Sequence, residues 1–190
     1  MRLFVAVEIG AAIAAGARAL IADLRRHAER LAPRARISWV DPDRAHLTVR
    51  FIGEVDEVKA HAIEEVLRLQ IDIAPFELTV AGLSAFPPRG RPRVLWVGLT
   101  MGLDAMMQLE RQITLRLQQA HVPADEKPYR PHLTLARIRD AGGLRSPALC
   151  DTWSDVVLGT TRVEASTLFE SRLSSTGPEY VALQRTPLRS

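Results

Sequence analysis

A histidine-x-threonine motif inside an apolar, β-branched run occurs twice in this chain of 190 residues. His46-Leu47-Thr48-Val49 comes back as His132-Leu133-Thr134-Leu135. Side chains of an extended strand alternate between two faces, so residues two apart point the same way. We therefore expect each histidine to share a face with its threonine, while Leu47, Val49 and Phe51 share the other. Such a strand has one buried face and one face that can carry chemistry.

The surroundings of the motif are repeated too. A strand pattern over residues 2–7 precedes a helical segment and the first motif, and residues 93–99 precede a second helical segment and the second motif. One such motif alone is more often a structural histidine, but a recurring order indicates an internal duplication. Two halves related by a pseudo-two-fold axis would bring both histidines to one cleft. We predict an α+β fold with two lobes, in which antiparallel sheets and flanking helices surround a central cleft.

Apolar spacing predicts three helices, one from Gly10 to just before Pro33, one over 56–70 and one over 103–120. Their expected buried faces are, in order, Ile13, Ala17, Leu20, Ile21 and Leu24; Val58, Ala62, Val66 and Leu69; and Met106, Leu109, Ile113 and Leu117. Strands are expected over about 46–52, 76–83, 94–99, 156–158, 162–170 and 180–183, and a loop over 141–150. The length suits a single domain spanning residues 1–190.

Composition restricts the function classes. The net charge is +3 and almost all of the positive charge is arginine, since Lys59 and Lys127 are the only lysines. Arginine forks match phosphate oxygens, although arginine richness can equally reflect genome composition. Cys150 is the only cysteine, so a disulfide within the chain is excluded and a thiolate metal site is disfavoured. With no apolar run of membrane-spanning length and no signal-peptide pattern, we expect a cytoplasmic protein without a membrane partner.

Two histidines facing one cleft could act as acid and base in a displacement at phosphorus. One imidazole would take a proton from the attacking water and the other would give one to the departing oxygen, because histidine titrates near neutrality. The hydroxyls of Thr48 and Thr134 could donate to the non-bridging phosphate oxygens. The motifs hold no carboxylate at ligand spacing, and two histidines leave a zinc site short of ligands, so we expect no metal and no cofactor.

The sequence around and between the two motifs resembles that of a known family. Six segments match, in order, the two-histidine (2H) phosphoesterase superfamily. They are the opening Arg2-Leu3-Phe4-Val5-Ala6, Trp39-Val40, the stretch from His46 to Val55, Phe86-Pro87, Arg91–Trp96 and Pro131–Arg137. The resemblance is to its bacterial and archaeal group called 2′-5′ RNA ligase or RNA 2′,3′-cyclic phosphodiesterase. It covers nearly the whole chain. Arg44-Ala45 departs from the Asn-Leu usual in relatives.

The resemblance implies a two-lobed fold with a central cleft, and hydrolysis of RNA ending in a 2′,3′-cyclic phosphate to a 2′-phosphate without a metal. It implies His132 as the general base for water (proton acceptor) and His46 as the general acid for the 3′-oxygen (proton donor). Thr48 and Thr134 would bind the phosphate. The substrates would be RNA or nucleotides with such ends, tRNA fragments among them, and we expect a monomer.

Other residues near the motifs are candidates as well. Arg137 could bind phosphate, but regular alternation aims it away from His132, so this role requires a bulge; a surface salt bridge is the alternative. Arg130 and Tyr129 could contact RNA, Tyr129 by stacking, or Tyr129 could be a packing residue. Arg89, Arg91 and Arg93 could guide an RNA backbone or belong to a solvated loop. We interpret His27, His61 and His121, which have no threonine partner, as ordinary surface or cap residues.

Two further functions stay open. An ATP-independent 2′-5′ RNA ligase that joins tRNA halves would use the same site, because microscopic reversibility lets the same histidines serve both directions. A non-catalytic module that binds RNA or nucleotides is the third possibility. The presence of both histidines and both threonines favours an enzyme.

Overall fold

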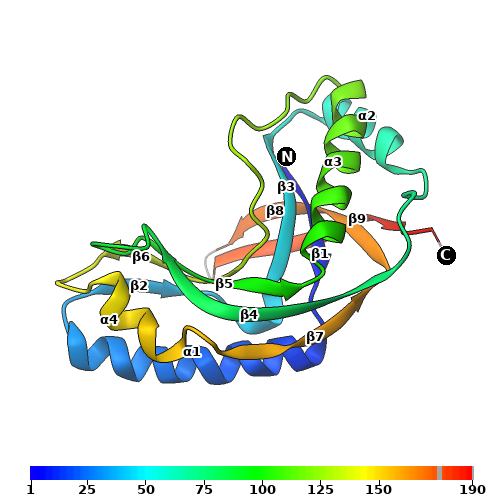
Figure 1. Cartoon of the computed structure of the whole chain (residues 1–190). Coiled ribbons are helices and arrows are strands. Elements are labelled where there is room, and N and C mark those ends of the chain that lie inside the picture. The colour runs from blue at the N-terminus through cyan, green and yellow to red at the C-terminus, as the bar shows by residue number, and fades with distance from the viewer. Residues whose placement is uncertain (175–176, 190) are drawn as a thin grey trace.

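The computed structural model describes residues 1–174 and 177–189 (Figure 1). Its strands are β1 (Arg2–Glu8), β2 (Arg36–Trp39), β3 (His46–Glu54), β4 (Phe76–Phe86), β5 (Val94–Met101), β6 (Leu133–Asp140), β7 (Val157–Val163), β8 (Ala165–Ser174) and β9 (Gly177–Pro187). Its helices are α1 (Ala11–Leu31), α2 (Glu57–Leu67), α3 (Leu103–Gln119) and α4 (Ser146–Cys150), with short 3₁₀ turns η1 (Pro42–Arg44) and η2 (Asp151–Trp153). The predicted α+β class is confirmed.

The strands form one sheet in the order β7-β4-β5-β6-β3-β1-β8-β9, with β2 paired to β6 beside this path. Its named strands all pair antiparallel. The two strands that carry the motifs lie at the centre, and they are joined there by one paired position, Leu47 with Leu133. Outward from this centre, each half of the sheet has the motif strand, then the strand that precedes the motif's helix (β5 or β1), then two further strands. A pseudo-two-fold axis therefore passes close to this leucine pair. The two halves of the sheet form the two lobes of Figure 1.

The helices are exchanged between the lobes. α1 follows β1 in the chain yet packs on β7, at the far edge of the other half-sheet. α3 follows β5 yet packs on β3 and α2. Gly16 allows the close approach of α1, because a Cβ there would lie 2.4 Å from the carbonyl oxygen of Leu158. Helix exchange therefore ties both halves to one hydrophobic core.

Two of the three predicted helix faces are confirmed. The expected stripes of α1 and α3 are buried throughout. The prediction for the second helix is wrong at two of its four residues, since Val58 is 82% exposed and Leu69, beyond the end of α2, is 72% exposed. Ala62 and Val66 are partly buried against the core. A competing stripe of Ala60, Ile63 and Leu67 is buried instead. Part of the expected loop over 141–150 is the short helix α4. Within the described residues, none of the helices has the length and apolar character needed to cross a bilayer.

Both motif strands contain a β-bulge at the same position. Thr48 and Arg50 face consecutive residues of β1, which leaves Val49 as the extra residue. Thr134 and Ala136 face consecutive residues of β5, which leaves Leu135 as the extra residue. A bulge reverses the alternation of the side chains beyond it. The expectation that Phe51 shares the buried face of Leu47 and Val49 is therefore wrong: Phe51 is 47% exposed.

Candidate active site

The leucine pair at the centre of the sheet sets the geometry of the motifs. With Leu47 opposite Leu133 in an antiparallel pair, His46 stands opposite Thr134, and Thr48 stands opposite His132. Histidines at diagonal positions of such a pair are on the order of 7–8 Å apart. All four side chains are half-buried. The structure thus brings the four predicted site residues together, with each histidine beside the threonine of the other motif.

Both imidazoles are oriented in the same way. Nδ1 of His46 lies 3.1 Å from the carbonyl oxygen of Arg44, and Nδ1 of His132 lies 2.7 Å from the carbonyl oxygen of Arg130. A carbonyl can only accept, so each Nδ1 carries the proton and donates it. Within residues 1–174 and 177–189, neither Nε2 has a hydrogen-bond partner. Each Nε2 is therefore free to accept or release a proton.

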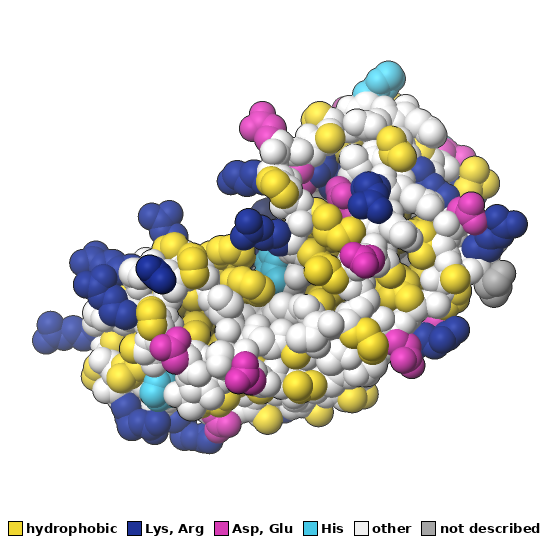
Figure 2. Space-filling view, in the orientation of Figure 1, with side chains coloured by type: hydrophobic (Ala, Val, Ile, Leu, Met, Phe, Trp, Pro, Cys, Tyr) yellow, Lys and Arg dark blue, Asp and Glu magenta, His cyan; other side chains and the backbone are white. Residues whose placement is uncertain are grey.

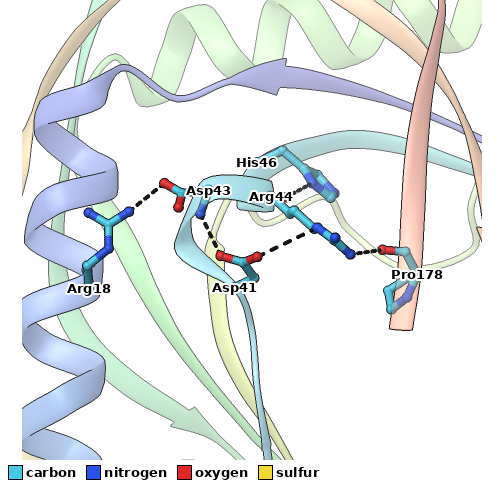
Figure 3. Close-up of polar contacts among 6 residues, drawn as sticks. All are labelled: Arg18, Asp41, Asp43, Arg44, His46 and Pro178. Atoms are coloured by element: carbon cyan, nitrogen blue, oxygen red, sulfur yellow. Dashed lines mark hydrogen bonds and ion pairs between the residues drawn. The ribbon is translucent and has the colours of Figure 1, made fainter. Parts of the chain in front are cut away.

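A small polar network fixes the turn before His46 (Figure 3). Asp41 caps η1 by accepting from the backbone N–H of Asp43 at 3.1 Å. The guanidinium of Arg44 lies 3.6 Å from the carboxylate of Asp41 and donates to the carbonyl of Pro178 at 3.1 Å. Arg18 of α1 pairs with Asp43. The carbonyl that orients His46 is thus held between a helix and the start of β9.

The two histidines differ in their surroundings. The His46 ring stacks on Phe4 at 4.8 Å and meets the edge of Tyr180 at 4.9 Å between ring centroids. Burial among these rings lowers the pKa of His46 below its usual value of 6.5, against a smaller opposite effect of the hydrogen bond to Arg44. His132 is less tightly enclosed, with Trp96 at 5.9 Å and Phe86 at 6.2 Å. The aromatic enclosure makes the site chemically unequal despite its symmetric backbone.

Cavities reach both histidines. One of about 820 Å³ is lined by Thr48, His132, Phe51 and Phe86 together with Tyr129 and Arg130. Another of about 600 Å³ is lined by His46, Arg44, Phe169 and Tyr180 among others. Figure 2 shows the molecule hollowed between its two lobes, with a histidine visible inside the hollow. The predicted central cleft is therefore present, and aromatic side chains from both lobes contribute to its walls.

The bulge at Leu135 places Arg137 on the same face as His132 and Thr134. A bulge of this kind is what a phosphate-binding role of Arg137 requires, because regular alternation would aim its side chain away from His132. Arg137 is exposed, and in the described part of the chain it forms no ion pair, so the salt-bridge alternative finds no support.

Tyr129 and Arg130 lie in the wall of the larger cavity. The Tyr129 hydroxyl donates to the carbonyl of Thr48 at 3.0 Å, and burial raises the pKa of this phenol. Tyr129 therefore packs against the first motif as well as facing the cavity. Arg130 is exposed, and its carbonyl orients His132.

Sequence reasoning missed a buried arginine. The Arg50 side chain is 4% exposed; it pairs with Asp125 and donates to the carbonyl of Pro123 at 2.5 Å. These contacts fix the segment that runs from α3 to the second motif and forms one wall of the cleft. Phe51 and Phe86 were also missed as cavity residues. The alternation Val49-Arg50-Phe51 is that of a regular strand, so nothing in the sequence indicated the bulge that buries Arg50 and exposes Phe51.

A metal centre finds no set of ligands among the described residues. No group of three or more histidine, cysteine, aspartate or glutamate side chains is placed to hold a metal ion in that part of the chain. The Cys150 thiol is buried, and burial together with Asp151 raises its pKa to about 11. What the site offers is two imidazoles, two hydroxyls and an arginine.

Comparison with known proteins places this site in a family. The family model described as LigT like Phosphoesterase matches residues 12–96 and 102–180. Curated relatives include the RNA 2′,3′-cyclic phosphodiesterase of Aquifex aeolicus, 32% identical over 77% of this chain and 79% of its own length. The protein of that name from Aeropyrum pernix is 36% identical over 76% of this chain and 82% of its own length. The chain belongs to the LigT-like phosphoesterase family.

Solved structures agree on the fold. The protein TT0787 of Thermus thermophilus superimposes with a TM-score of 0.69 at 29% identity, covering 100% of this chain and 98% of that one. E. coli LigT complexed with 3′-AMP superimposes with a TM-score of 0.73 at 22% identity over the same shares. At that identity the second likeness concerns the fold alone. The predicted family and two-lobed architecture are confirmed.

Proposed function

We propose that this chain is an RNA 2′,3′-cyclic phosphodiesterase that needs no metal and hydrolyses a terminal 2′,3′-cyclic phosphate to a 2′-phosphate. The main observation behind the proposal is the pair of imidazoles whose Nδ1 atoms are held by backbone carbonyls and whose Nε2 atoms have no partner among the residues that the structure describes. The names of the curated relatives support the substrate class.

In the proposed reaction His132 accepts a proton from water as its oxygen bonds to phosphorus. The bond from phosphorus to the 3′-oxygen breaks, and His46 gives that oxygen its proton, so the product is a 2′-phosphate and a free 3′-hydroxyl. Thr48, Thr134 and Arg137 hold the non-bridging oxygens, where negative charge grows. In the part of the chain that the structure describes, neither of these two threonine hydroxyls forms a hydrogen bond, so both can donate to a bound phosphate.

Tyr129 and Arg130 contact the nucleotide in this proposal, from the cavity wall they occupy. Residues 1–190 work as one domain, which the shared hydrophobic core supports. The expectations of a cytoplasmic location and of a monomer stay predictions.

Product analysis tests the proposal. A short RNA ending in a 2′,3′-cyclic phosphate is incubated with the protein in EDTA, and the products are separated by chromatography against 2′- and 3′-phosphate standards. We expect turnover to the 2′-phosphate. A 3′-phosphate would reverse the assigned leaving group, and activity that appears only after a divalent metal is added would overturn the metal-free reaction. Absence of turnover, with joining of tRNA halves bearing matched ends, would favour the ligase.

The enclosure of His46 gives a pH test of the two roles. Protonated His46 is a stronger acid than an exposed imidazolium because burial lowers its pKa, so kcat/KM should fall as the pH rises through that lowered pKa. Tyr180→Ser admits water to the ring edge and should raise this pKa towards 6.5. If His46 is the proton donor, the falling, alkaline limb of the pH profile moves to higher pH.

If the rising, acidic limb moves instead, His46 is the base and the roles are exchanged. Leu173→Ser is the control, because Leu173 lies on the neighbouring strand β8 and is 84% exposed. It should leave both limbs in place.

A further inference from the structure

A third cavity, of about 820 Å³, lies at the end of β6 away from the histidines and is lined by arginine. We call it the arginine groove and define it by Arg91, Arg93 and Arg139 with Pro92, Asp140 and Gly142. The three arginines are exposed. Figure 2 shows Lys and Arg side chains gathered at the end of the molecule where Figure 1 places the far ends of β2 and β6.

The charge of the protein is concentrated here. Residues 86–93 and 137–145 together contain six arginines and one acidic residue, Asp140. Since the whole chain has 25 basic and 22 acidic side chains, the remainder holds 19 basic and 21 acidic ones. The mild overall basicity is therefore the property of one end of the molecule, where the field attracts a polyanion.

These arginines are not used to hold the fold. Within residues 1–174 and 177–189, Arg91, Arg93 and Arg139 form no ion pair and no side-chain hydrogen bond. The carboxylate of Asp140 instead accepts from the backbone N–H of Gly142 at 3.0 Å. Elsewhere exposed arginines such as Arg68 and Arg189 do have carboxylate partners. The groove thus presents guanidinium groups whose donors are free for a ligand.

The loop that carries the arginines is held in place. The N–H of Arg93 donates to the carbonyl of Phe86 at 2.7 Å. The hydroxyl of Ser146, a residue 1% exposed, donates to the carbonyl of Pro87 at 2.8 Å, and its N–H donates to the carbonyl of Gly90 at 3.0 Å. A fixed loop loses less conformational entropy when it binds a ligand, so these arginines are prepared for binding.

The groove lies next to the catalytic cleft. Phe86 lines the cleft, and its neighbour Pro87 lines the groove. Along β6, Arg137 lies on the same face as His132 beyond the bulge at Leu135. Arg139 follows two residues later, as the extra residue of a second bulge opposite β2. From His132 to Arg139 the strand covers roughly 20 Å. Guanidinium groups therefore line a path that starts at the candidate phosphate ligand Arg137 and ends in the groove.

We propose that the arginine groove binds the phosphate backbone of single-stranded RNA upstream of the 2′,3′-cyclic end. This proposal rests on the proposed function, because the cyclic end must lie between the two histidines. A stacked strand carries one phosphate per about 3.4 Å, so a path of roughly 20 Å meets several consecutive phosphates. A single nucleotide in the cleft does not reach the groove. The groove thus makes the enzyme prefer an RNA chain over a cyclic mononucleotide.

The test compares two substrates, a 2′,3′-cyclic mononucleotide and a twelve-nucleotide RNA with the same end, at several salt concentrations. The groove variant carries Arg91→Ser, Arg93→Ser and Arg139→Ser. For the RNA, we expect kcat/KM to fall roughly 10- to 100-fold and the slope of its logarithm against the logarithm of the salt concentration to decrease in magnitude by about 2. Turnover of the mononucleotide should stay as in the parent.

The matched control carries Arg68→Ser, Arg162→Ser and Arg189→Ser, three exposed arginines with carboxylate partners outside the groove. It loses the same charge, so an equal fall in both variants would mean a general field effect and overturn the groove. An unchanged RNA rate, or equal losses on both substrates, would overturn it too.

A binding measurement separates failure of the groove from failure of the proposed function. Fluorescence anisotropy of the RNA labelled at its 5′ end reports affinity whether or not the chain turns over either substrate. If no turnover occurs, the proposed function fails, and the groove is judged by binding alone. Weaker binding of RNA by the groove variant than by the matched control supports it, and equal binding overturns it.

Discussion

Alanine at either His46 or His132 should lower the rate of cyclic phosphate hydrolysis by about 10²- to 10⁴-fold, the usual contribution of one positioned acid or base. Neither Nε2 has a hydrogen-bond partner within residues 1–174 and 177–189, and alanine removes the proton donor or acceptor at that point. The two act on one displacement at phosphorus. The double variant should therefore be far less impaired than the product of the two single effects.

The measurement is single-turnover hydrolysis of the cyclic RNA, with binding followed separately by anisotropy. His61→Ala is the matched control, because His61 is an exposed histidine of α2 outside the cavities that reach the motifs. It should be as active as the parent. Glutamine variants at positions 46 and 132 retain more of the side-chain volume and guard against a folding defect. A His46→Ala protein that keeps its rate within a few-fold while folded would contradict two-histidine catalysis.

Leu133→Ala should lower both the stability of the fold and the catalytic rate. Leu133 is fully buried and pairs with the equally buried Leu47 at the junction of the half-sheets. Removing its side chain leaves a cavity, which costs about 2–5 kcal/mol in the free energy of unfolding. It also loosens the contact that sets His132 against His46, and a misplacement of about 1 Å in a catalytic arrangement can cost on the order of 10²-fold in rate.

Urea denaturation measures the first effect, and kcat measured well below the unfolding midpoint measures the second. Leu24→Ala is the matched control, since Leu24 of α1 is also fully buried but lies away from the motifs. We expect similar losses of stability in both variants and a lowered kcat only for Leu133→Ala. Equal kcat values would mean that the leucine junction does not position the histidines.

The sequence predicted the regular parts of this site. The sequence alone could place His46, Thr48, His132 and Thr134 together. Alternation within a strand and repetition of a motif can both be recognised without knowing which strands pair. The lengths and buried faces of α1 and α3 could also be predicted from their own residues, since each helix has a single apolar stripe.

The irregular parts depend on partners far along the chain. A bulge is defined by the strand opposite, so neither the exposure of Phe51 nor the face of Arg137 follows from β3 or β6 alone. Two apolar stripes compete around α2, and packing against α3 buries Ile63 and Leu67, while Val58 and Leu69, which follows the helix, stay exposed. The enclosure of His46 by Tyr180 likewise joins residues from opposite ends of the sequence.

The place of β1 in the sheet has a consequence during synthesis. β1 emerges before the other strands of the sheet, but it lies between β3 and β8, and its second partner spans Thr167–Glu170. Ribosomes add about 5–20 residues per second, so one edge of an apolar strand stays unpaired for roughly 10 s after β3 has emerged. Exposed strand edges promote aggregation. Until Thr167–Glu170 emerge, the edge of Leu3–Ala6 therefore lacks its native partner strand and can pair with another chain.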